Sequence, residues 1–104
     1  MSKEKKIANA VTHKLLNSAI VSDIKIVILQ RGWIYIGRWH RKKNDCQLSK
    51  AYCIRTWGTT KGLSELVHGA TSKTVLDKCE GLVEFDWLTV IHTICVDPSK
   101  WPNI

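Results

Sequence analysis

Three runs of strand-forming residues, separated by short polar turns, constrain the fold of this chain more than any other feature. Residues 24–30 are rich in β-branched side chains, which pack well on a pleated sheet. Residues 33–41 and 47–56 follow, and the alternation of their side chains gives each strand two distinct faces. Strands joined by short turns pair with their neighbours, so the sequence predicts a three-stranded antiparallel meander.

Helical spacing occurs on both sides of this meander. Apolar side chains recur at four-residue spacing in residues 4–20, which predicts an N-terminal helix. Leu63, Leu66 and Val67 also recur at helical spacing, and Gly69 after them is typical of a helix end. The sequence therefore predicts a second, short helix after the meander.

The remaining elements and the chain length complete the expected fold. Residues 82–86 and 88–97 are typical of strand, which places a C-terminal strand after the short helix. Residues 1–104 are enough for one domain. We expect a single α+β domain with its N-terminal helix at about 4–20 and its sheet and short helix at about 23–97.

The net charge of +7 is concentrated in one segment of the chain. Residues 31–55 have a net charge of +6 and contain one acid, Asp45, whereas residues 56–104 are net acidic. A concentrated basic segment attracts phosphates and polyanions. For Lys42-Lys43 alone, a solvated strand edge or hairpin tip, which lysine protects against aggregation, is the favoured explanation.

Aromatic and basic side chains alternate within this basic segment, and three of the five tryptophans lie in or beside it: Trp33, Trp39 and Trp57. Arginine binds phosphate bidentately, and aromatic rings stack on bases for about 1–3 kcal/mol each. The same rings are also compatible with one buried face of a sheet. The binding interpretation predicts a ligand site made of Arg31, Arg38, Trp39, His40, Arg41, Arg55 and Trp57.

No motif of a known catalytic, cofactor or metal site is present. The chain has no Cys-x-x-Cys pair, no His-Glu-x-x-His frame, no P-loop and no Gly-x-Gly-x-x-Gly turn. Glu84 and Asp86 are two residues apart on a predicted strand, and an exposed strand face explains them more simply than acid–base chemistry. We expect free cysteine thiols, no metal, no cofactor and no enzymatic activity.

The segment Ala51-Tyr52-Cys53-Ile54-Arg55-Thr56-Trp57, followed by Leu63-Ser64-Glu65-Leu66, resembles a small family of phage-encoded proteins of unknown function. Members share an Ala-x-x-Ile-x-x-Trp segment, a Leu-Ser-Gln/Glu-Leu helix and an isoleucine-rich strand. The resemblance spans about residues 24–97 and does not include the N-terminal helix. It implies a viral origin and a compact fold, and it brings no catalytic residues.

These observations favour a phage accessory protein that binds a small anionic nucleotide and so sequesters a host immune signal. The first alternative is a nucleic-acid-binding protein that uses the basic 31–55 hairpin. The second is an inhibitor of a host defence protein, because tryptophan and arginine are preferred at protein interfaces. A steep salt dependence would separate polynucleotide binding from binding in a buried nucleotide pocket.

The sequence also predicts where the protein is located and whether it forms oligomers. No apolar run approaches the roughly 18 residues of a membrane-spanning helix, and the N-terminus lacks the apolar centre of a signal peptide. We therefore expect a cytoplasmic protein, in the host cell if phage-encoded, with no membrane partner. The amphipathic helix at 4–20 could pair with a second copy, which predicts a homo-oligomer.

Overall fold

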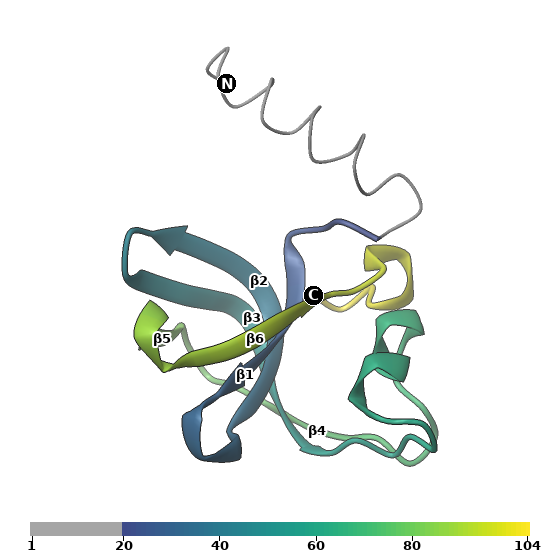
Figure 1. Cartoon of the computed structure of the whole chain (residues 1–104). Coiled ribbons are helices and arrows are strands. Elements are labelled where there is room, and N and C mark those ends of the chain that lie inside the picture. The colour runs from purple at the N-terminus through teal and green to yellow at the C-terminus, as the bar shows by residue number, and fades with distance from the viewer. Residues whose placement is uncertain (1–19) are drawn as a thin grey trace.

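Three consecutive strands form the middle of an antiparallel sheet in the computed structural model, which describes residues 20–104 (Figure 1). They are β1 (Ile24–Leu29), β2 (Ile34–Lys42) and β3 (Asp45–Thr56). The sequence pattern located the ends of each strand to within two residues. A 3-10 turn, η1 (Gln30–Gly32), joins β1 to β2.

Three shorter strands complete the sheet: β4 (Val75–Lys78), β5 (Val83–Asp86) and β6 (Val90–Cys95). The strand order is β4-β3-β2-β1-β6, and β5 also pairs with β3. β5 pairs with the first residues of β3, at Asp45–Leu48, and β4 pairs with the last ones, at Tyr52–Thr56. The long strand β3 therefore has two different partners along one edge.

β3 bends between these two partners. Its register with β2 shifts there, and Lys50 has a left-handed φ of 49°. A bulge of this kind bends the strand and increases its twist. Gly37 of β2 lies against the bend, because a Cβ there would come within 3.0 Å of the Ser49 carbonyl oxygen and 3.1 Å of Ala51.

The two faces of the sheet pack into separate cores. The first core contains the isoleucines of β1 and β2 and is covered by Leu66 of the 3-10 helix η2 (Leu63–His68) and by Trp101. The second core lies on the other face and contains Val27, Leu48, Ala51, Trp39 and Phe85. Alternation along β1 and β2 explains why successive residues enter different cores.

The expected α+β class is wrong for the described residues. Residues 20–104 form one six-stranded antiparallel sheet, and all of their helical turns are 3-10 turns, including the segment expected as a short helix. The two segments expected as strand, 82–86 and 88–97, form the shorter strands β5 and β6. Asp86 accepts a hydrogen bond from the Leu88 backbone N–H at 2.8 Å and begins the turn η3 (Trp87–Thr89) between them. The helix expected at 4–20 lies, except for its last residue, outside the described residues.

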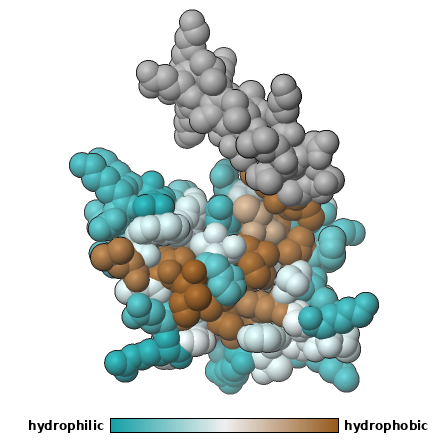
Figure 2. All heavy atoms as spheres, in the orientation of Figure 1, coloured by the Kyte–Doolittle hydropathy of each residue, from teal (hydrophilic) through white to brown (hydrophobic). Residues whose placement is uncertain are grey.

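Some apolar surface stays exposed beside the second core. Figure 2 shows apolar residues across the middle of one face, in the region that β6 occupies in Figure 1. Leu88 in η3 and Ile91 in β6 are 73 % and 58 % exposed. Within residues 20–104, no helix has the length and apolar character needed to cross a membrane.

Candidate functional site

The predicted site residues lie at two opposite ends of β2 and β3. Antiparallel pairing places Arg41 opposite Cys46 at the hairpin end and Tyr35 opposite Cys53 toward the other end. At about 3.3 Å per residue, Trp33 and Arg41 are roughly 25 Å apart along the strand. The structure therefore does not bring the seven predicted residues into one pocket.

The hairpin end contains a group of rings and cations, which we name the hairpin-end cluster: Lys25, Trp39, Arg41, Phe85 and Trp87. The centroid of the Trp39 ring lies 5.9 Å from that of Phe85 and 6.1 Å from that of Trp87. The guanidinium carbon of Arg41 lies 3.6 Å from the Trp87 centroid, and Lys25 Nζ lies 5.9 Å from the Trp39 centroid. Both cations are within cation–π range of an indole.

Backbone pairing explains why this cluster forms. The pairing of β5 with β3 carries Phe85 to Trp39. The backbone N–H of Trp87 donates to the Asn44 carbonyl at 2.8 Å, which joins η3 to the turn between β2 and β3. Arg41 Nε donates to the Lys43 carbonyl at 2.7 Å, so the terminal guanidinium nitrogens remain available to a ligand.

The cations at the hairpin end have no carboxylate partner among residues 20–104. The one ion pair of the described residues joins Arg55 and Asp77, at the far end of β3. Arg41, Lys42 and Lys43 are exposed. Exposed cations without ion-pair partners attract anions, and Asp45, opposite Lys42 in the strand pairing, offsets part of their charge.

Arg38 and His40 lie on the first-core side of β2, away from the hairpin-end cluster. Arg38 is half-buried, and its Nη2 donates to the Ile104 carbonyl at 3.0 Å. His40 is exposed, and its Nε2 is 3.1 Å from Ser49 Oγ. Arg38 therefore holds the C-terminal segment, which is a structural use of a residue predicted to bind ligand.

The opposite end of the strands contains the other predicted residues. Arg31 is exposed in η1 and has a left-handed φ of 68°. Trp57, just after β3, is 43 % exposed, and Trp33, just before β2, is 57 % exposed. The Trp33 ring stacks on Tyr35 with 6.5 Å between centroids. This end therefore presents two aromatic surfaces to solvent.

Tyr35 and the cysteines near it are suited to packing. Burial raises the pKa of the Tyr35 hydroxyl, and the neighbouring Cys53 and Cys79 raise it further. Burial likewise raises the pKa of the Cys79 thiol. The Tyr35 hydroxyl and the Cys79 thiol therefore stay neutral near pH 7. No disulfide joins the four cysteines in this structure.

A shallow depression of about 350 Å³ lies on the basic side of the hairpin. Its lining residues are His40, Arg41, Lys42, Asp45 and Gln47. Gln47 is half-buried and the other four lining residues are exposed, so the depression is open to solvent. It can accept part of a larger anionic ligand, and it does not enclose one.

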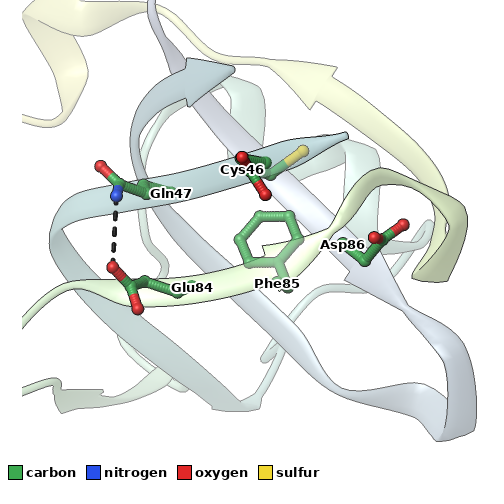
Figure 3. Close-up of a pocket in the computed structure, with 6 residues that line it drawn as sticks. Cys46, Gln47, Glu84, Phe85 and Asp86 are labelled. Atoms are coloured by element: carbon green, nitrogen blue, oxygen red, sulfur yellow. Dashed lines mark hydrogen bonds between the residues drawn. The ribbon is translucent and has the colours of Figure 1, made fainter. Parts of the chain in front are cut away.

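A second depression of about 400 Å³ lies over the pairing of β3 with β5 and is acidic (Figure 3). It is lined in part by the carboxylates of Asp45, Glu84 and Asp86. Gln47 Nε2 donates to Glu84 Oε1 at 3.2 Å. Glu84 and Asp86 lie on an exposed strand face, as predicted. These carboxylates repel anions, and Asp45 also lines the basic-side depression, so an anionic ligand is attracted most strongly to the part of that depression nearest Arg41 and Lys42.

Sequence reasoning did not find three members of the hairpin-end cluster: Lys25, Phe85 and Trp87. Phe85 and Trp87 lie in an acidic part of the chain, where the charge pattern draws no attention to them. Lys25 belongs to an apolar strand run. Only strand pairing brings them to Trp39 and Arg41. Among residues 20–104, no three histidine, cysteine or acidic side chains are arranged to hold a metal ion.

Comparison with known proteins does not assign this chain to a family. No protein-family model and no curated protein matches this chain. The resemblance to phage-encoded proteins therefore stays a prediction, and so do the cytoplasmic location and the homo-oligomeric state.

Proposed function

We propose that this protein binds single-stranded nucleic acid, without catalysis, through the exposed end of the β2–β3 hairpin. The observation that carries the proposal is the contact of Arg41 with the Trp87 ring, beside Lys42 and Lys43, where no described carboxylate forms an ion pair. Such cations bind phosphates, and nearby aromatic surfaces stack on bases.

The open shape of the surface supports a strand as the ligand. The depression beside Arg41 is lined almost entirely by exposed side chains. Trp33 and Trp57 offer further exposed rings at the other end of the strands, roughly 25 Å away. A single strand can contact both ends, whereas one nucleotide can contact only one.

A small anionic nucleotide is the second candidate ligand. The depression of about 350 Å³ beside His40 and Arg41 favours it, because its size is within the range of small-molecule sites. With that ligand, the function would be the sequestration of a nucleotide signal, as we expected from the sequence.

The test is fluorescence anisotropy with a labelled oligothymidylate, a labelled RNA and a labelled duplex over a series of salt concentrations. The variant Lys42→Gln/Lys43→Gln should weaken single-strand binding at least about tenfold and reduce the salt slope by about 1–2. The matched control is Lys61→Gln/Lys73→Gln, which removes the same charge from exposed lysines outside the cluster.

Three other outcomes of this experiment would decide against the proposal. Equal losses in the two variants would show that net charge, and not the hairpin, governs binding. Tighter binding of the duplex than of either single strand would exclude the stacking role. Competition by a cyclic dinucleotide with little salt dependence would favour the second candidate.

A further inference from the structure

Two small cavities adjoin one another beside the first core, between β3, β4 and the C-terminal segment. Their volumes are about 190 Å³ and about 210 Å³, and they share Tyr52 and Asn103 as lining residues. We name the pair the tail groove. Its combined volume, about 400 Å³, is within the range of small-molecule sites.

The smaller cavity is lined by hydrogen-bond donors and by no carboxylate: Lys50, Tyr52, Lys78 and Asn103. The strand register places Tyr52 directly opposite Lys78. Two ammonium groups, a hydroxyl and an amide in one small cavity match the acceptor oxygens of a phosphate. The cavity therefore has the chemistry of an anion site.

Lys50 is placed in this cavity by an uncommon backbone conformation. Its φ of 49° lies in the left-handed region, at the bulge where the register of β3 with β2 shifts. Bulges redirect side chains, and strained residues of this kind cluster at ligand sites. Lys50 and Tyr52, two residues apart on β3, both line this cavity.

The larger cavity is mainly apolar, and its walls are held in place. Leu76, Trp101 and Pro102 are among its lining residues. The buried Trp101 donates through Nε1 to the Leu66 carbonyl at 2.8 Å. Arg38 Nη2 donates to the Ile104 carbonyl at 3.0 Å, which holds the end of the same segment. A mainly apolar depression, with Trp101 and Ile104 held by these hydrogen bonds, thus adjoins the smaller cavity.

We propose that the tail groove binds a small organic monophosphate with one flat ring. The phosphate lies between Lys50 and Lys78, and the ring lies against Leu76, Trp101 and Pro102. This site is separate from the hairpin-end cluster, so it does not depend on nucleic-acid binding by the hairpin.

The test is an NMR titration of the ¹⁵N-labelled full chain with phenyl phosphate, inorganic phosphate and benzyl alcohol as separate probes. Phenyl phosphate should shift the amide signals of Lys78 and Asn103 and the indole signal of Trp101. Its affinity should exceed that of inorganic phosphate at least about tenfold, because the ring adds apolar burial.

The variant Lys50→Asn/Lys78→Gln should weaken phenyl phosphate binding at least about tenfold. Asparagine at position 50 tolerates the left-handed φ, so the bulge is kept, and the ligand-free spectrum of the variant checks its fold. Lys42→Gln/Lys43→Gln is the matched control and should leave the affinity unchanged.

Three results would overturn the proposal. Equal affinities for phenyl phosphate and inorganic phosphate would indicate a surface anion site without a ring pocket. Equal losses in the two double variants would indicate a general charge effect. Absence of signal shifts at Lys78, Asn103 and Trp101 with every probe would show that the groove binds no ligand of this class.

Discussion

The guanidinium carbon of Arg41 lies 3.6 Å from the centroid of the Trp87 ring, so the tip of the β2–β3 hairpin is joined to the turn between β5 and β6. The contact links two segments that are far apart in the chain. It also places a cation on an aromatic platform beside the exposed Lys42 and Lys43. One contact thus contributes both to the local structure and to the proposed binding surface.

A double-mutant cycle on this pair should show a coupling free energy of about 0.5–1 kcal/mol, because the cation–π contact is solvent-accessible. The cycle uses Arg41→Ala, Trp87→Ala and the double variant, with the free energy of unfolding measured in urea. Lys42→Ala combined with Trp87→Ala is the control cycle, and its coupling should be close to zero. A coupling for Arg41 no larger than that of Lys42 would contradict the contact.

Replacement of Gly58 by alanine should destabilise the fold by about 2–4 kcal/mol. Gly58 has a φ of 70°, and a Cβ there would collide with the backbone of Lys73 and Thr74. Thr71 Oγ1 donates to the Gly58 carbonyl at 2.6 Å, so the two segments cannot separate without loss of this bond. The expected cost combines left-handed strain with overpacking.

The control for this change is Gly81→Ala, since no atom lies within 4 Å of the Cβ that it would add. Its free energy of unfolding in urea should stay within about 0.5 kcal/mol of the original. Similar losses in the two variants would mean that Gly58 is not tightly packed against the 71–74 segment.

The main strands could be predicted from the sequence because each one is long enough to show its own pattern. β1 is rich in β-branched residues, and β2 and β3 alternate between two cores. β4 has only four residues, Val75–Lys78, which is too short for a periodic signal. The break between β5 and β6 agrees with the two segments expected as strand, and the hydrogen bond from the Leu88 N–H to the Asp86 side chain forms there.

The candidate site was less predictable because strand pairing determines which residues meet. Trp39 and Arg41 were found from the basic and aromatic pattern of one segment. The aromatic partner that they share, Trp87, comes from a turn after β5, in the acidic part of the chain. Trp57 shares the predicted pattern but follows the last residue of β3, at the end away from Trp39 and Arg41. The composition of a segment does not show which of its residues lie close together in the fold.

Acid should weaken the C-terminal turn η4 (Pro98–Lys100) through Asp97. Asp97 Oδ1 accepts from the Ser99 hydroxyl at 2.7 Å and from the Ser99 backbone N–H at 3.0 Å, and these bonds lower the pKa of the carboxyl. Because the folded pKa is below the unfolded one, this stabilisation is complete above the unfolded pKa. It is lost as pH falls through the folded pKa.

The check is the urea midpoint of unfolding as a function of pH for the original chain and for Asp97→Asn. The variant should lose less stability than the original chain between neutral and acidic pH. Glu80→Gln, at an exposed acid, is the control and should keep the original pH dependence. If the stability of Asp97→Asn depends on pH in the same way as that of the original chain, the Ser99 hydrogen bonds do not stabilise the folded state.

Release of Arg55 from its ion pair should strengthen the proposed binding of single-stranded nucleic acid. Arg55 Nη2 lies 2.6 Å from Asp77 Oδ2, with side chains 69 % and 44 % exposed. An exposed pair of this kind contributes at most about 1 kcal/mol, so Asp77→Asn should barely change stability and should raise strand affinity about two- to fivefold. Anisotropy with labelled oligothymidylate measures the change. Glu80→Gln alters the net charge equally, away from Arg55, and an equal gain in both variants would show that the strand does not reach this end of β3.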